Sequence, residues 1–191
     1  MNRNCECRLS NVAKDYVSTF HNILDAMIQG MTNAELSDSI SYNFIMQMIP
    51  HHRAAIEMSR NLLKYTTFVP LQDMAMQIVA EQTKSIEDMR QVICACGKTD
   101  NCRQDTRCYQ AQTEQIMNTM FSEMEKACAT NQLNATFMRE MIPHHRGAVE
   151  MSELALQYRI CPELVPILNA IIRSQKQEIR QMQQLLRCMG C

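Results

Sequence analysis

The amino-acid sequence predicts an all-α fold built from two tandem repeats of about three helices each. Its 191 residues include only four glycines and five prolines, and no strand-like alternation of β-branched residues recurs. Apolar side chains instead recur at helical spacing, and the chain matches itself at a shift of 93 positions. Together these observations predict long helices that pack as one or two bundles.

The internal repeat is clearest around two histidine pairs. Residues 48–53, with the sequence MIPHHR, are identical to residues 141–146, and Glu57-Met58-Ser59 matches residues 150–152. The alignment needs no gap, so we expect both copies to share one fold. The predicted organisation is a first repeat at 12–95, a cysteine-rich polar linker at 96–108 and a second repeat at 109–191.

Three helices are expected in each repeat. Gly30 is expected to end the first helix, because glycine is common just past a helix C-terminus. Pro70 and Pro162 suit the first turns of the third and sixth helices. The expected helices cover about 12–30, 37–64 and the segment from Pro70 onwards, then 109–129, 133–158 and 162–188.

Pro50 and Pro143 lie inside the middle helices, beside the histidine pairs. Each removes one backbone donor and should bend its helix there. The sequence does not distinguish a bend that shapes a binding site from a bend that the helix only tolerates.

Charge and hydropathy exclude several classes of function. The net charge of −1 gives no field that would attract nucleic acid or an anionic membrane surface. No apolar run reaches the roughly 18 residues that span a bilayer. The start, Met1-Asn2-Arg3-Asn4-Cys5, lacks an apolar core, so we expect no signal peptide in this chain.

Both histidine pairs lie on a predicted buried helix face. With Met48 at 0° on a helical wheel, His51 falls at about −60° and His52 at about +40°. Met58 falls at about −80°, two turns after His51. Phe44 and Leu62 share this side. The charged residues on the opposite side are Arg53, Glu57 and Arg60.

Imidazole and thioether groups together indicate a soft metal. Imidazole binds copper, zinc, iron and nickel, whereas thioether sulfur selects Cu(I) among common metals, and Ag(I) is the alternative. The predicted ligands on the middle helices are Met48, His51, His52, Met58, Met141, His144, His145 and Met151. Core-facing thioethers of the other helices could complete a sulfur-rich shell, and these are Met27, Met31, Met89, Met120, Met124 and Met182.

Other metals fit the sequence less well. Zinc is less favoured, because no third histidine, cysteine or carboxylate shares the face. A di-iron site needs Glu-x-x-His motifs and inward glutamates, but Glu57 and Glu150 are expected to point outward. Met46 also points outward on the wheel, which makes it the least expected ligand.

The motif around each histidine pair resembles a known family. Phe44-x3-Met48-Ile-Pro-His-His-x2-Ala55-x2-Met58 and its repeat are similar to the domain of unknown function 305 family, in two tandem copies covering nearly the whole chain. The resemblance implies a ferritin-like four-helix bundle associated with copper and silver, in which the histidines and methionines above bind the metal or line its site. It also implies an exported or periplasmic location.

Ten cysteines lie in the predicted ends and connections. An even number in such places favours disulfides and an oxidising, extracytoplasmic compartment. The alternatives are thiolate metal clips in a reducing compartment, or a redox pair at Cys188-Met-Gly-Cys191. The cysteines are Cys5, Cys7, Cys94, Cys96, Cys102, Cys108, Cys128, Cys161, Cys188 and Cys191.

The leading functional hypothesis is a non-enzymatic copper or silver protein for sequestration, transfer or tolerance. The sequence offers no activated nucleophile, no acid–base pair and no phosphate-binding loop, and we expect no inward-facing carboxylate. The expected partner is a metal ion, with a metallochaperone-type protein or a second copy as further candidates. The alternative is a structural or interaction bundle whose core histidines are hydrogen-bonded.

Overall fold

The computed structural model describes residues 9–190, which form six α-helices and no strand. The helices are α1 (Asn11–Thr32), α2 (Ile40–Leu63), α3 (Val69–Cys96), α4 (Arg103–Glu125), α5 (Leu133–Ala155) and α6 (Val165–Cys188). The all-α prediction is confirmed. No described helix combines the length and hydropathy that a bilayer span requires.

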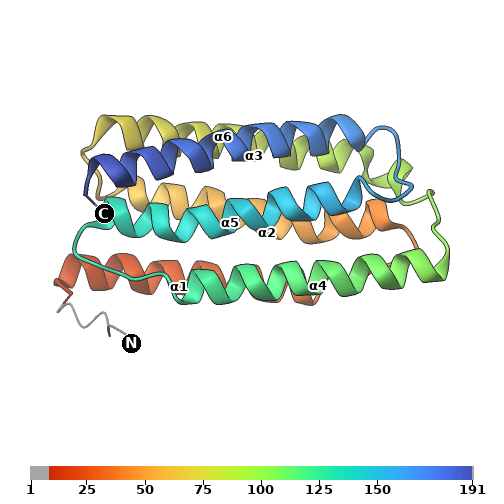
Figure 1. The fold of residues 1–191 in the computed structure, drawn as a ribbon, viewed down its shortest axis with the longest axis horizontal. Helices are drawn as coiled ribbons and strands as arrows, with labels where there is room; N and C mark the ends of the chain where they lie inside the picture. Colours follow the sequence, from red (N-terminus) through yellow and green to blue (C-terminus); the bar gives the residue numbers. More distant parts are fainter. Residues whose placement is uncertain (1–8, 191) are drawn as a thin grey trace.

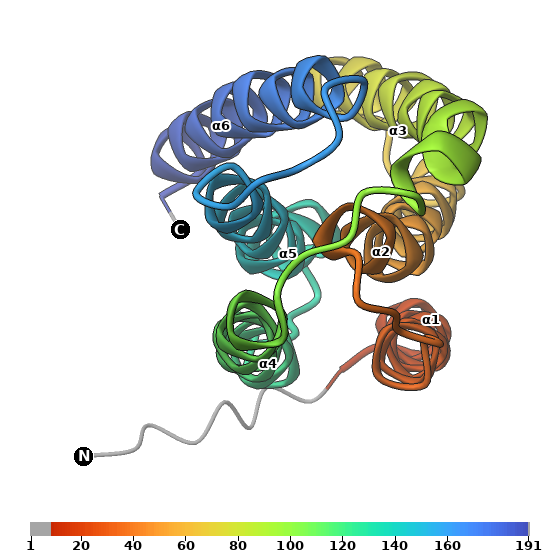
Figure 2. The ribbon, with the colours of Figure 1, turned by 90° about the vertical axis from the view of Figure 1, so that its right-hand side faces the viewer.

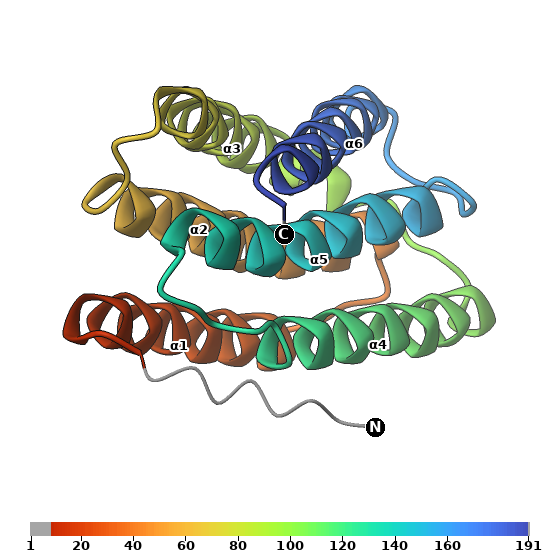
Figure 3. The same ribbon diagram turned by 60° about the vertical axis from the view of Figure 1, so that its left-hand side comes forward.

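The helices form three layers of two (Figure 1). Helices α2 and α5 lie side by side in the middle layer, with α3 and α6 on one side and α1 and α4 on the other (Figures 2 and 3). Helices α2, α3, α5 and α6 contact one another in a ring and make a four-helix bundle. Helix α1 packs on α2, and α4 packs on α5.

Helix α1 extends past Gly30, where the sequence predicted its end. The helix continues to Thr32, and a Cβ added to Gly30 would lie 2.8 Å from the Cβ of Pro50. Glycine therefore permits a close approach of α1 to α2 beside the proline. Helix α2 begins at Ile40, where the side chain of Ser39 accepts a hydrogen bond from the backbone of Tyr42.

Helix α4 begins at Arg103, six residues before the expected start, because tertiary contacts fix the segment before it. Asn101 accepts a hydrogen bond from the backbone of Ile40 at 2.9 Å and donates to the carbonyl of Arg159 at 2.7 Å. Helix α6 begins at Val165, so Pro166 and not Pro162 lies in its first turn, and the prediction for Pro162 is wrong. Helices α2 and α5 both continue through their internal prolines.

A disulfide joins Cys96, at the end of α3, to Cys161, before α6. Both cysteines are buried, and Ser39 donates a hydrogen bond to the carbonyl of Cys96. Cys128 is also disulfide-bonded, so the disulfide prediction is confirmed for these cysteines. Among residues 9–190, the free thiols are those of Cys94, Cys102, Cys108 and Cys188. Cys5, Cys7 and Cys191, and with Cys191 the predicted redox pair, lie outside the described residues.

Candidate metal centre

All fourteen candidate ligands are buried in the helical core, and none is more than 2% exposed. On α2 the charged residues Arg53, Glu57 and Arg60 are exposed, as the helical wheel predicted. Met46 is partly exposed, which fits its expected outward direction. The buried face of α2 predicted by the helical wheel is therefore confirmed.

His51 of α2 and His144 of α5 stack where the two middle helices meet. Their ring centroids lie 3.7 Å apart, with 31° between the ring planes. The Nε2 atom of His51 lies 3.1 Å from the carbonyl oxygen of His144, and the reverse contact measures 3.2 Å. The two halves of the chain are therefore joined through their own histidines.

These contacts determine which nitrogen of each ring carries the hydrogen. A carbonyl oxygen can only accept, so Nε2 of each ring must be the donor, and Nδ1 keeps an unprotonated lone pair. In His51 and His144 this Nδ1 atom is buried without a hydrogen-bond partner. Burial, with the charge of neighbouring histidines, lowers the pKa of His51 to about 3 and the pKa of His144 well below its ordinary value. Both rings are therefore neutral near pH 7, which is the form that binds metals.

The second histidine of each pair points toward the outer helices of the bundle. His52 Nε2 lies 3.1 Å from Ser85 Oγ on α3, and His145 Nε2 lies 2.8 Å from a carboxylate oxygen of Glu178 on α6. The latter is an ion-pair distance, but the ring N–H is not aligned for a good hydrogen bond. Nδ1 of both rings is again buried without a partner. Burial, followed by the charge of His51, lowers the pKa of His52.

Met27 of α1 and Met120 of α4 pack on the side of the middle helices that carries the first histidine of each pair. Met27 lines a surface hollow with Ala54, and Met120 packs against Gly147, the equivalent position on α5. Ala54 is about 160° around α2 from His52 but only about 60° from His51. The structure therefore does not bring Met27 or Met120 together with the second histidines, and it places them on the side of the first.

The helical positions of the remaining methionines also place some on the side of the first histidines and others on the side of the second. Met58 lies two turns after His51 on one face of α2, whereas Met48 lies one turn before His52. Met89 lies one turn after Ser85, and Met182 one turn after Glu178, the two residues that contact the second histidines. Met31 and Met124 lie one turn after Met27 and Met120. Met141 and Met151 occupy on α5 the positions of Met48 and Met58.

Two buried carboxylates correct the expectation that no glutamate faces the interior. Glu140 and Glu178 are each 2% exposed. At the shift of 93 positions they align with Gln47 and Ser85 of the first repeat. The stripe of Gln175 and Met182 on α6 has the helical spacing that places Glu178 on the same face, and this was the available signal.

Glu140 belongs to a separate buried contact. Tyr16 Oη donates a hydrogen bond to Glu140 Oε2 at 2.8 Å and so links α1 to α5. Burial raises the pKa of Glu140 to about 8, against the opposing effect of the Tyr16 hydrogen bond. The carboxyl is therefore mostly protonated at neutral pH. Within residues 9–190, no three histidine, cysteine, aspartate or glutamate side chains form a group that could hold a metal ion.

The sequence pattern of the family described as "Domain of unknown function (DUF305)" matches residues 23–93 and 41–186. The chain belongs to the DUF305 family. Among solved structures, this DUF305 chain is similar to "CopM in the Ag-bound form (by soaking)", with 27% identity and a TM-score of 0.58 over 77% of this chain and 94% of that one. It is also similar in fold to a DUF305 fragment from Deinococcus radiodurans, with 22% identity and a TM-score of 0.56 over 77% and 95%. No curated protein matches the sequence.

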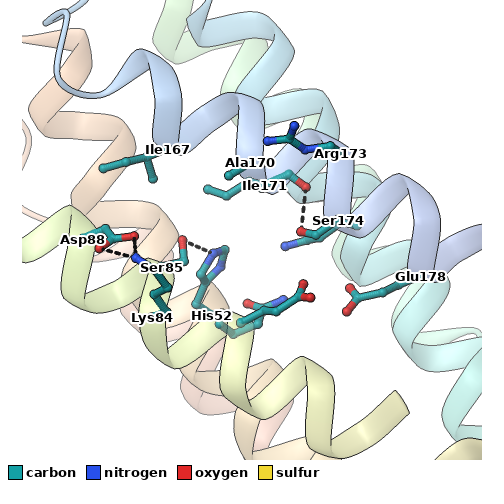
Figure 4. Close-up of a pocket in the computed structure, with 13 residues that line it drawn as sticks. His52, Lys84, Ser85, Asp88, Ile167, Ala170, Ile171, Arg173, Ser174 and Glu178 are labelled. Carbon is teal, nitrogen blue, oxygen red and sulfur yellow. Dashed lines mark hydrogen bonds and ion pairs between the residues drawn. The ribbon is translucent and has the colours of Figure 1, made fainter. Parts of the chain in front are cut away.

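A cavity of about 330 Å³ in this DUF305 protein opens between α3 and α6 (Figure 4). His52 and Glu178 line it together with Gln82, Ser85 and Gln175. The other charged residues that line it are Glu81, Lys84, Asp88 and Arg173. The cavity therefore leads from the surface between α3 and α6 to His52, the second histidine of the first pair.

Proposed function

We propose that this DUF305 protein binds a soft monovalent cation, Cu(I) or Ag(I), through buried imidazole and thioether groups. The role is sequestration, transfer or tolerance, without catalysis of a reaction. The observation that carries the proposal is the set of four buried histidine Nδ1 atoms without a hydrogen-bond partner, in a core rich in methionine.

An unpartnered polar atom in a protein core needs an explanation. Leaving a buried acceptor unsatisfied costs about 1–3 kcal/mol, and here the cost recurs at four rings. A metal ion bound at Nδ1 would remove that cost, because neutral imidazole is a common metal ligand. Thioether sulfur has little attraction for hard cations but binds Cu(I) well. The donor set of this core therefore fits Cu(I) or Ag(I) best.

The likeness to the silver-bound CopM structure supports the same class of cargo. The buried Cys96–Cys161 disulfide supports an oxidising, extracytoplasmic compartment. In such a compartment a metallochaperone-type partner, or a second copy of this chain, would deliver or receive the cation.

A structural role for the histidines is the rival function. The reciprocal contacts of His51 and His144 do join α2 to α5, which such a role would require. They use only Nε2, however, and leave every Nδ1 atom unexplained.

The test is a Cu(I) titration in competition with a chromogenic chelator. Thiols are alkylated first, with the disulfides intact, so that free cysteines do not bind copper. Two double variants, His51→Leu/His144→Leu and His52→Leu/His145→Leu, remove the ring nitrogens and keep most of the side-chain volume. His21→Leu, at an exposed position on α1, is the matched control.

We expect both double variants to lose at least about tenfold in Cu(I) affinity, the low end for loss of a metal ligand's support, while His21→Leu binds like the wild type. Circular dichroism verifies that each variant is folded. If folded double variants bind Cu(I) as tightly as the wild type, the histidines are structural and the proposal is wrong.

A further inference from the structure

The four paired histidines are at most 1% exposed, so a cation cannot reach them directly from solvent. The cavity between α3 and α6 is lined by one of them, His52 (Figure 4). It is also lined by Glu178, which contacts His145. The cavity therefore touches the second histidine of both repeats, one directly and the other through a carboxylate.

Glu178 occupies a position at which the two repeats differ in charge. The equivalent residue, Ser85, has no charge and contacts His52 through its hydroxyl. One carboxylate oxygen of Glu178 lies 2.8 Å from His145 Nε2, and the other is buried without a hydrogen-bond partner. A buried carboxylate with an unused oxygen can accept a cation.

The charges around the cavity suit a cation. The ammonium of Lys84 lies 2.6 Å from Asp88, so these two charges largely cancel. Glu81 takes part in none of the ion pairs found in residues 9–190, and its Oε2 atom is buried without a partner. With Glu178, the lining carries two carboxylates against the single remaining cation of Arg173. Clefts of one sign raise the local concentration of the opposite ion.

We propose that the cavity between α3 and α6 is the passage through which the metal cation reaches the buried histidines, and that Glu178 is the carboxylate that passes it to His145. The proposal rests on the soft-metal function above. Carboxylate oxygen binds soft cations less well than imidazole and thioether do. Glu178 therefore suits brief binding during transfer, and the nitrogen and sulfur donors suit the final site.

The test measures how fast Cu(I) enters, separately from how tightly it binds. Thiol-alkylated protein is mixed in a stopped-flow instrument with the Cu(I)–bicinchoninate complex, and loss of the complex's absorbance gives the loading rate. Glu178→Ser makes the second repeat resemble the first. Adding Ser85→Glu to that variant moves the carboxylate to the other side of the same cavity.

A second pair of variants tests the passage without changing a charge. Ala170 is exposed and lines the cavity, whereas the neighbouring Asn169 is exposed and does not line it. Ala170→Trp should narrow the opening, and Asn169→Trp is the control for adding an exposed tryptophan to the same turn of α6.

We expect Glu178→Ser and Ala170→Trp each to slow loading about tenfold, the lower end of what a charged cleft contributes to association. Equilibrium affinity should stay within about threefold, because neither change removes a final ligand. Ser85→Glu added to Glu178→Ser should restore most of the rate, and Asn169→Trp should load like the wild type. A role of Glu178 limited to folding would not predict this recovery.

Three results would overturn the passage. An unchanged loading rate in Glu178→Ser would exclude a transfer role for Glu178. Equal loading rates for the two tryptophan variants would exclude the cavity as the route of entry. A fall in affinity as large as the fall in rate makes Glu178 a resident ligand. If the wild type takes up no Cu(I), the proposed function itself is wrong, and the passage is rejected with it.

Discussion

His51 and His144 each place Nε2 against the backbone carbonyl of the other, at 3.1 and 3.2 Å. The contact lies where α2 meets α5, so the same two side chains hold the halves of the chain together and keep a free Nδ1 each. Under the proposed function, these two residues join the halves of the chain through Nε2 and bind the cation through Nδ1.

Acid should destabilise the metal-free protein through these histidines. The pKa of His51 is lowered to about 3 in the folded chain, whereas the unfolded chain takes up the proton near pH 6.5. The stabilising contribution is therefore complete above pH 6.5 and is lost as the pH falls toward 3. We expect the free energy of unfolding to fall by about 1 kcal/mol per pH unit for this ring, measured by urea denaturation between pH 7.5 and 5. A variant with His51→Leu should show a smaller slope, and an equal slope would exclude His51 as its source.

Glu140→Gln should stabilise the protein increasingly as the pH rises. The pKa of Glu140 is raised to about 8, so the folded state holds a proton that the unfolded state releases above about pH 4.5. Wild-type stability accordingly loses about 1 kcal/mol per pH unit from pH 4.5 to 8 through this group. Glutamine cannot ionise, and it stands naturally at the equivalent Gln47. Urea denaturation of Glu140→Gln and of the exposed control Glu57→Gln at several pH values measures the change in the free energy of unfolding. A stabilisation by Glu140→Gln that does not grow with pH would contradict the prediction.

Gly30→Ala should destabilise the fold although alanine favours helix. Propensity alone predicts a gain of about 1 kcal/mol for this change inside α1. The new Cβ would instead lie 2.8 Å from the Cβ of Pro50, a rigid neighbour. We expect a net loss of roughly 1–3 kcal/mol from this overpacking, measured by thermal unfolding beside the exposed control Gln29→Ala. A stabilised Gly30→Ala would show that α1 and α2 are not held this close.

Removal of the Cys96–Cys161 disulfide should lower the melting temperature substantially. The bridge closes a loop with a sequence separation of 65 between two buried cysteines. Loss of such a crosslink costs roughly 2–4 kcal/mol. Cys96→Ala/Cys161→Ala should therefore melt well below the wild type, whereas Cys94→Ser/Cys188→Ser, at exposed free thiols, should not. Equal melting of the two double variants would mean that the bridge contributes little.

The buried face of α2 could be predicted because it depends only on helical periodicity along one segment. The predicted helix end at Gly30 was wrong, because the sequence does not distinguish a glycine that ends a helix from one that allows a neighbouring helix to pack closely. The start of α4 depends on Asn101, whose partners Ile40 and Arg159 are remote in the chain. Such contacts are not visible in local sequence patterns.

The sequence predicted that the candidate ligands lie on buried helix faces, but not how they are arranged in the core. Adjacent histidines suggested one cluster, yet α2 directs His51 toward α5 and His52 toward α3. Glu178 was not predicted because it lies on α6, outside the middle helices that carry the histidine pairs. Reading the aligned pair Ser85 and Glu178 on the buried stripe would have found it.

The central claim is that the buried Nδ1 atoms bind a soft cation, and long-range ¹H–¹⁵N NMR of histidine-labelled, thiol-alkylated protein tests it most directly. Titration with Ag(I) should shift the Nδ1 resonances of His51, His52, His144 and His145 and leave exposed His21 unchanged. The Nε2 atoms of His51 and His144 should remain protonated throughout. If Ag(I) leaves all four Nδ1 resonances in place, the buried histidines are not its ligands and the account is wrong.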